Sequence, residues 1–218
     1  SPNELGPGLW VWHQRGGLFR KQLEDYVRDL HLERGYDLVV TPHIARGVLW
    51  ETSGHLAKFS ENMYPPMRDE QGDYYAKPMN CPFHVLIYKS KTRSYRELPM
   101  RLSELGTIYR HERLGTLHGL LRIRGGTQDD SHIFCTPDQL VDEILKVFEL
   151  TFEIHRSFGF EDPVVNLSTL PGQTILDPEM AERATGALKT ALDRSGLDWS
   201  EAAGEGTFYG PKVDFHFR

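Results

Sequence analysis

Residues 104–134 read ELGTIYRHERLGTLHGLLRIRGGTQDDSHIF, and this stretch decides the fold that the sequence predicts. Its two ends, 104–112 and 122–134, each have the residue pattern of a β-strand. The segment between them, RLGTLHG, contains glycine and is short enough to join two antiparallel strands. We therefore predict an antiparallel pair of strands here.

The second of these strands has one polar face, because successive side chains of a strand point to opposite sides of a sheet. Six residues share that face: Arg122, Arg124, Gly126, Gln128, Asp130 and His132. Such a face is either solvated surface or the floor of a site for a polar, anionic ligand. Alternation alone leaves both interpretations open.

The composition is that of a soluble globular protein. Of the 218 residues, 39% are hydrophobic and 26% charged, and the net charge of −6 gives no global basic field for nucleic acid, which would need a local patch. The two cysteines, Cys81 and Cys135, suit a reducing compartment. There is no signal-peptide pattern and no apolar run long enough to span a membrane. We expect a cytoplasmic protein that does not bind membranes.

The segments that precede the stretch predict a helix, a strand and a hairpin. Apolar residues recur at helical spacing from Leu18 to Leu30, and Gly35 provides a stop. The run DLVVTP (37–42) is typical of a buried strand that ends at its proline. A hairpin turn is predicted near 70–73.

The segments that follow it predict two helices and two strands. The first helix is expected to have Thr136 at the N-cap, with Pro137 and Gln139 at the next favoured positions. A strand is expected at 163–168, a second helix from Asp177 to about Ser195, and a strand at 207–218. These elements predict an α+β fold, an antiparallel sheet flanked by helices rather than βαβ units. The chain stops within a strand, which suggests a fragment.

Arginine is the candidate phosphate-binding residue, because the sequence has neither a P-loop nor a G-x-G-x-x-G motif before a helix. Arg110 and Glu112 share one strand face, and Arg122 and Arg124 share another. A guanidinium group pairs bidentately with phosphate oxygens, and a carboxylate accepts from an exocyclic amine. The hairpin is therefore either a nucleotide site or a solvated, charged hairpin.

Metal binding has a weaker signal in the spacing of the residues. Cys81 and His132 are too far apart for a local zinc motif, although CPFH adds His84 at a C-x-x-H spacing. The alternative to a metal site is that the cysteine thiol packs in the core and the histidines lie on the surface. His55, in TSGHLAKF, is by default a surface or loop histidine.

Several blocks together resemble the catalytic core of the threonyl-tRNA synthetase family, class II aminoacyl-tRNA synthetases. The resemblance begins near residue 4 and covers the rest of the chain. The blocks are RGYDLVVTPHI, LWETSGH, KPMNCPFH, YRHE, TQDDSHIFC and GEGTFYGPKVDFH. It implies a class II antiparallel sheet with helices, in which 1–218 form a single, partial catalytic domain without motif 3, editing domain or anticodon-binding domain. It also implies homodimerisation through motif 1, the helix before Gly35 and the strand into Pro42.

The resemblance implies that the family's ATP site lies on the predicted strand pair. Arg110 matches the catalytic arginine that binds the α-phosphate, and Glu112 the residue that receives the adenine amino group. Arg122 matches a phosphate ligand. Gly126 lies where the family has a phenylalanine that stacks on adenine, and losing such a stack costs about 1–3 kcal/mol. Mg²⁺ would accompany ATP.

A zinc ion held by one cysteine and two histidines is also implied, and Cys81 and His132 match two of the three ligands. The zinc binds the amino and hydroxyl groups of threonine, which excludes valine. The threonine-contacting positions are Met79, Gln128, Asp130, Tyr209 and Lys212. His55 matches a catalytic histidine implicated in transfer to the tRNA hydroxyls.

The implied function is that of the core of threonine–tRNA ligase, in which ATP activates L-threonine to threonyl-adenylate for transfer to tRNA(Thr). The sequence departs from the family pattern at five positions: Phe83, Gly126, Leu170, Gly172 and Gln173. It also ends before the third zinc histidine, so we expect an open, weak zinc site and no tRNA charging by the fragment alone. The alternative is a synthetase-derived nucleotide- or tRNA-binding or regulatory module that does not aminoacylate.

Overall fold

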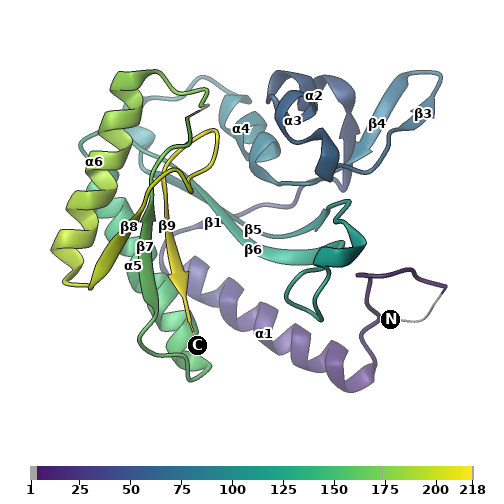
Figure 1. Cartoon of the computed structure of the whole chain (residues 1–218), viewed down its shortest axis with the longest axis horizontal. Helices are drawn as coiled ribbons and strands as arrows, with labels where there is room; N and C mark the ends of the chain where they lie inside the picture. Colours follow the sequence, from purple (N-terminus) through teal and green to yellow (C-terminus); the bar gives the residue numbers. More distant parts are fainter. Residues whose placement is uncertain (1–3, 173, 218) are drawn as a thin grey trace. The chain divides into compact units, whose positions relative to one another are not determined.

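The computed structural model describes residues 4–172 and 174–217. The chain divides into two compact units, one ending at Phe134 and the other beginning at Cys135, and each is described here by itself (Figure 1). Gln173, one of the departures from the family pattern, lies outside the described residues.

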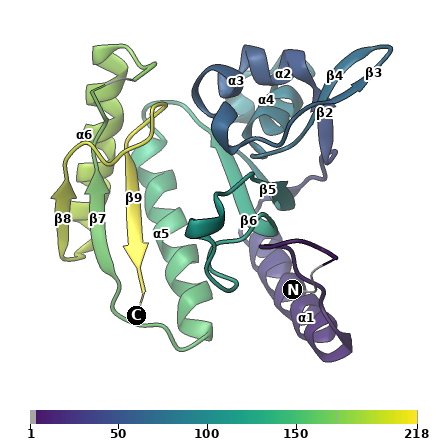
Figure 2. The same cartoon turned by 45° about the vertical axis from the view of Figure 1, so that its right-hand side comes forward.

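The first unit is built on the predicted pair of strands. β5 (Met100–Tyr109) and β6 (Gly125–Phe134) are antiparallel, with a register that runs from Met100 opposite Phe134 to Tyr109 opposite Gly125. β1 (Asp37–Leu38) adds a short parallel strand to the other side of β5. In Figures 1 and 2, helix α1 (Gln14–Glu33) lies on one side of this hairpin and helices α2–α4 on the other.

The strand predicted at 37–42 is present only at its start, and the predicted burial of its apolar residues is wrong. Only Asp37 and Leu38 form a ladder, and both are exposed, as is Val40 at 93%. The strand lies at the edge of its sheet, with β5 as its one hydrogen-bonded neighbour within the described residues. The apolar residues of 37–42 therefore suggested a buried strand, whereas the strand found here is exposed.

A second sheet and three helices complete this unit. β2 (Ile44–Arg46), β4 (Gly72–Ala76) and β3 (Met67–Asp69) are antiparallel, and β3 and β4 form the hairpin predicted near 70–73. The helices are α2 (Gly47–Thr52), α3 (His55–Lys58) and α4 (Cys81–Lys89). Short 3₁₀ turns lie at Ser60–Asn62, Tyr95–Glu97 and Leu114–Thr116. Trp50 and Phe83 form the buried centre of this part.

The second unit has the sheet order β8-β7-β9 and two helices. Its strands are β7 (Val164–Ser168), β8 (Trp199–Ala202) and β9 (Lys212–His216), and its helices are α5 (Leu140–Ser157) and α6 (Pro178–Ser195). Apolar side chains of both helices pack around Leu167 on the same face of this sheet. The α+β fold class is thus confirmed.

Two details of this unit differ from the prediction. β7 and β8 are parallel and are joined by α6, which is one βαβ unit. Helix α5 begins at Leu140 rather than directly after Thr136, because hydrogen bonds from Gln139 N to Thr136 O and from Leu140 N to Pro137 O tighten the preceding turn. The start of α6 is as predicted, with Asp177 accepting a hydrogen bond from Met180 N at 2.9 Å.

None of the described helices is both long and apolar enough to cross a membrane.

Candidate functional site

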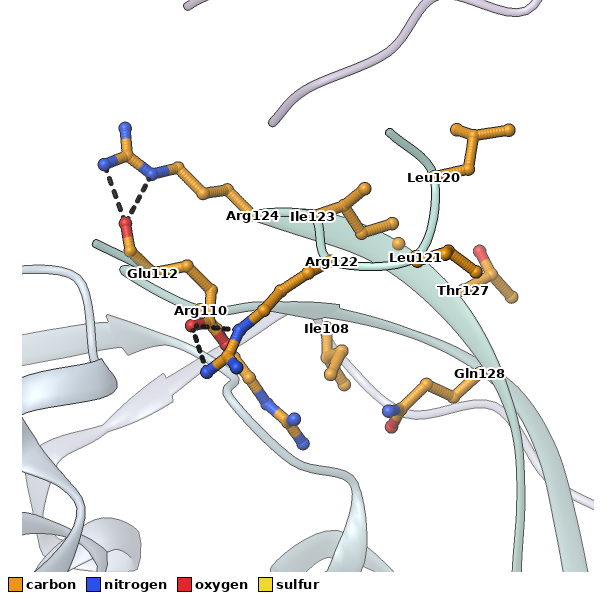
Figure 3. A pocket seen from close by; sticks show the side chains of 11 residues that line it. Ile108, Arg110, Glu112, Leu120, Leu121, Arg122, Ile123, Arg124, Thr127 and Gln128 are labelled. Carbon is orange, nitrogen blue, oxygen red and sulfur yellow. Dashed lines mark hydrogen bonds and ion pairs between the residues drawn. The ribbon is translucent and has the colours of Figure 1, made fainter. Parts of the chain in front are cut away.

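A cavity of about 400 Å³ opens in the first unit where the β5–β6 hairpin ends (Figure 3). One part of its wall is aliphatic and another carries arginine and glutamate side chains, so it offers both an apolar surface and hydrogen-bond donors. The lining residues are Ile108, Arg110, Glu112, Leu120, Leu121, Arg122, Ile123, Arg124, Gly126, Thr127 and Gln128. All four residues predicted for ATP are among them.

Two arginines hold Glu112 in place, as Figure 3 shows. Arg122 donates to Glu112 Oε2 from Nε at 3.0 Å and from Nη2 at 2.9 Å. Arg124 donates from Nε and Nη2 to the backbone oxygen of Glu112 at 2.9 and 2.8 Å. Glu112 is buried while the Arg122 side chain is half-exposed. The charges of Arg122 and Glu112 thus neutralise each other. A nucleotide that binds to both side chains must break this ion pair.

Arg110 is held in the cavity wall by other groups. Its Nε donates to the backbone oxygen of Pro78 at 3.1 Å, and its guanidinium carbon lies 5.8 Å from the centre of the Phe59 ring. Both contacts fix the direction of a cation that points into a partly enclosed space, where its interaction with an anion is stronger than in water.

The space above Gly126 is taken by a neighbour. A Cβ atom at this position would overlap Cδ1 of Ile123 and lie 3.3 Å from its Cγ1. The aliphatic end of Ile123 therefore occupies the space that the side chain of a larger residue at position 126 would need. Ile123 also forms part of the apolar wall of the cavity.

A group of three potential metal ligands combines two residues of β6, Asp130 and His132, with Cys81 at the start of α4. One ligand atom each from Cys81, Asp130 and His132 lies within 4.8 Å of the others. Burial, followed by the negative charge of Asp130, raises the pKa of the Cys81 thiol to about 11. Burial also lowers the pKa of His132, despite the opposing effect of Asp130. Sulfur, nitrogen and carboxylate oxygen together suit Zn²⁺, so the residues present fit this ion.

Three buried polar residues lie next to this group, and two of them, Asn80 and Glu104, had no role in the sequence patterns. Asn80 is fully buried and donates from Nδ2 to Asp130 Oδ2 at 3.0 Å, while Glu104 lies opposite Asp130 in the β5–β6 ladder. His84 is also fully buried, with Nε2 at 3.1 Å from Glu104 Oε2 and Nδ1 at 2.9 Å from His132 Nδ1. The C-x-x-H spacing had made His84 a candidate metal ligand, but both of its ring nitrogens contact protein groups, and it is not among the three residues whose ligand atoms converge.

The default prediction that His55 is a surface or loop histidine is wrong. It is the first residue of α3, is 7% exposed, and packs edge-on against Trp50. Its Nδ1 lies 2.8 Å from Ser53 Oγ and its Nε2 lies 3.3 Å from the sulfur of Met79, another predicted site residue. Burial lowers the pKa of His55, so the neutral ring is favoured at neutral pH.

Two predicted site residues belong to the second unit. Tyr209 is exposed, and Lys212 at the start of β9 donates to the carboxylate of Asp214 at 2.8 and 2.7 Å. Asp214 also accepts a hydrogen bond from Ser168 Oγ at 2.6 Å. The roles of Tyr209 and Lys212 toward threonine stay a prediction.

The sequence matches the family described as "tRNA synthetase class II core domain (G, H, P, S and T)" over residues 59–217. It is 53% identical over 211 residues to the threonine–tRNA ligase of Sulfurihydrogenibium sp. (strain YO3AOP1), covering 97% of this chain and 33% of that protein. It is 50% identical over 216 residues to the threonine–tRNA ligase of Aquifex aeolicus (strain VF5), covering 99% of this chain and 34% of that protein. The chain thus spans about a third of the length of these relatives.

Solved structures give the same picture. The RNA-binding domain of threonyl-tRNA synthetase from Cryptosporidium parvum Iowa II superposes with a TM-score of 0.90 at 40% identity, covering 99% of this chain and 53% of that one. A prolyl-tRNA synthetase of Giardia lamblia, in complex with prolyl-adenylate, shares the fold alone, with a TM-score of 0.65 at 16% identity over 73% of this chain and 34% of that one.

Proposed function

The chain belongs to the class II tRNA synthetase core domain family (G, H, P, S and T), and from this premise we propose that it forms part of the catalytic core of a threonine–tRNA ligase. The reaction is the attack of the threonine carboxylate on the α-phosphate of ATP, which gives threonyl-adenylate and pyrophosphate, followed by transfer to tRNA(Thr). The identity to curated threonine–tRNA ligases over nearly the whole chain supports this choice among the five enzymes of the family.

One observation carries the proposal: a single face of β6 runs from the cavity to the metal group. Gly126 and Gln128 line the cavity, and Asp130 and His132, the next residues with the same orientation, belong to the group of three ligands. At about 3.3 Å per residue, Gln128 at the cavity and Asp130 in the metal group lie about 7 Å apart along the strand. This arrangement suits a nucleotide at one end and a small amino acid at the other.

In this proposal Arg110 binds the α-phosphate and stabilises charge that develops there, and Mg²⁺ enters with ATP. Glu112 and Arg122 exchange their mutual ion pair for the adenine amino group and a phosphate oxygen. Cys81 and His132 would hold Zn²⁺, which would supply a Lewis acid for the amino and hydroxyl groups of threonine. Asp130 would accept a hydrogen bond from the threonine hydroxyl, and Asn80 orients its carboxylate.

The remaining assignments of the proposal concern the second step and the assembly. His55 takes part in transfer to the tRNA hydroxyl, with Ser53 setting the orientation of its ring. Two copies associate through α1 and the segment 37–40, in which Leu38 of β1 and Val40 just after it are exposed and apolar. Cys81 and Cys135 are both free thiols in the described structure. Free thiols agree with a cytoplasmic setting.

Threonine-dependent ATP–pyrophosphate exchange tests the proposal. It is measured on the 218-residue chain and on the polypeptide encoded by the complete reading frame, with valine and serine as competing substrates. Asp130→Asn should lower exchange by roughly ten- to a hundredfold, because a hydrogen bond to a charged group contributes about 1.5–3 kcal/mol. Asp129→Asn is the matched control, since Asp129 points to the other face, where it lies 3.4 Å from His31. Absence of exchange in both polypeptides at millimolar ATP would refute the proposal.

A second function, a nucleotide-binding module that does not aminoacylate, has one observation in its favour. Ile123 fills the space above Gly126, and Arg122 is occupied by Glu112. ATP binding with a micromolar to millimolar dissociation constant, together with no exchange in the complete polypeptide, would favour this alternative.

A further inference from the structure

Arg124 lies in the wall of the cavity, and the proposed reaction leaves it without a role. Its backbone oxygen accepts a hydrogen bond from Arg110 N at 2.9 Å, and its backbone nitrogen donates to Gly8 O at 2.8 Å. Its guanidinium group makes a third connection, with two hydrogen bonds to the backbone oxygen of Glu112 at 2.9 and 2.8 Å (Figure 3). Arg124 thus connects the N-terminal segment, the end of the hairpin and Glu112.

The contact with the N-terminal segment restricts the Arg124 side chain. Gly8 has a φ of +76°, and a Cβ atom there would lie 3.0 Å from Arg124 N and 3.2 Å from Arg124 Cγ. Glycine allows both this backbone conformation and the close approach. Because the backbone at position 8 packs against the base of the Arg124 side chain, less conformational entropy is lost when the guanidinium group is held at Glu112.

Glu112 lies in a segment that no strand ladder holds. β5 ends at Tyr109, and Glu112 N donates to Arg110 O, two residues earlier, at 2.8 Å. Irregular backbone of this kind opens at a lower cost in free energy than a ladder does. The two hydrogen bonds from Arg124 fix the carbonyl group of Glu112. They therefore also limit the directions in which its side chain can leave the backbone.

The two arginines that contact Glu112 differ in what a nucleotide would do to them. Arg122 contacts the carboxylate, and its side chain is 56% exposed. In the proposed function this ion pair is exchanged for the adenine amino group. Arg124 contacts the backbone oxygen, which the base does not need, and a bidentate guanidinium contact is specific in its geometry. The contact of Arg124 can therefore persist in the complex.

We propose that Arg124 is a positioning residue that holds the backbone of Glu112, so that the carboxylate stays directed into the cavity when Arg122 releases it. Arg124 thereby contributes to recognition of the adenine amino group, and this ligand rests on the proposed function. Because Arg124 acts through Glu112, its loss should weaken binding of the base and leave binding of the phosphates unchanged.

Isothermal titration of the polypeptide encoded by the complete reading frame with Mg²⁺–ATP, and with Mg²⁺ and inorganic triphosphate, separates these two effects. Arg124→Met keeps the length of the side chain and removes its donors. It should weaken ATP roughly tenfold, because a single hydrogen bond to a charged group is at stake, and change triphosphate by less than about twofold. Arg124→Lys keeps the charge and should have a smaller effect of the same kind, which also serves if the methionine variant does not fold. Arg113→Met is the matched control, since Arg113 pairs with Glu61 where both side chains are 83% exposed, and should change neither affinity.

Two further measurements show whether Arg124 acts through Glu112. In a Glu112→Ala background, Arg124→Met should change the ATP dissociation constant by less than about twofold, because the carboxylate that it positions is gone. Hydrogen exchange followed by mass spectrometry reports on the amides of His111 and Glu112, which both donate backbone hydrogen bonds. Their exchange should be faster in Arg124→Met and unchanged in Arg113→Met.

Equal losses of ATP and triphosphate affinity in Arg124→Met, the same loss of ATP affinity without the Glu112 carboxylate, or unchanged hydrogen exchange would each overturn the inference. Wild type that binds neither ATP nor triphosphate would instead refute the nucleotide site of the proposed function. Faster exchange in Arg124→Met would then still show that Arg124 orders Glu112, and unchanged exchange would overturn that as well.

Discussion

Replacement of Gly126 by phenylalanine should improve ATP binding much more when Ile123 is also shortened. A Cβ atom at 126 overlaps Cδ1 of Ile123 and lies 3.3 Å from Cγ1, so the isoleucine must turn away before an aromatic ring can enter. Forcing extra atoms into a packed site costs about 1–3 kcal/mol, and we expect the lower end because Cδ1 is the end of its side chain. Stacking of adenine on the ring contributes about 1–3 kcal/mol.

The ring reaches its stacking position over adenine only when Ile123 has turned away, so this part of the steric cost is incurred on ATP binding. It offsets much of the stacking gain, and Gly126→Phe alone should change the ATP dissociation constant by less than about tenfold. In the Ile123→Ala background the steric cost disappears. The gain from Gly126→Phe there should exceed the gain in wild type by about 1 kcal/mol, or roughly fivefold in the dissociation constant.

Isothermal titration with Mg²⁺–ATP on the four proteins of this cycle measures the coupling. Gly126→Ala in both backgrounds is the matched control, because it introduces the Cβ contact without a ring to stack. Thermal unfolding of each variant shows whether the fold is retained. Equal gains in the two backgrounds would refute the steric reasoning, and no gain in either would show that adenine does not lie over position 126.

Three further predictions concern other parts of the chain. Zn²⁺ affinity should rise about tenfold per pH unit between pH 7 and 9, because the ion must displace one proton from Cys81, whose pKa is raised to about 11; a chelator competition assay showing no slope would contradict this ligand. Gly106→Ala should lower the free energy of unfolding by about 1–3 kcal/mol through its overlap with Asn80, whereas Gly115→Ala, which has nothing within 4 Å, should have little effect in the same denaturant titration. Leu167→Ala, at a fully buried position in β7, should cost about 2–5 kcal/mol, and a loss below 1 kcal/mol would show that this core rearranges.

Local patterns in the sequence determined the elements that rest on short-range chemistry. The alternation of side-chain character in 122–134, together with the short glycine-containing link before it, was sufficient to predict the β5–β6 pair. The dipeptide Asp177-Pro178 was sufficient to predict where α6 begins. The run at 37–42 misled because apolar composition does not distinguish a central strand from an edge strand. The predicted pairing of Thr136 with Gln139 is present, since Gln139 Oε1 accepts a hydrogen bond from Thr136 N at 3.0 Å, but α5 itself begins later, at Leu140.

The sequence by itself also determined the family, through blocks whose residues the resemblance could assign one by one. What only the tertiary structure decided is how those residues are held. His84 and His132 are 48 positions apart, and Asn80 and Asp130 are 50 apart. Ile123, in the link that precedes β6, fills the space above Gly126. Such contacts depend on how α4 packs on the β5–β6 hairpin and on which side chains are removed from water there, and no periodicity along the chain records either.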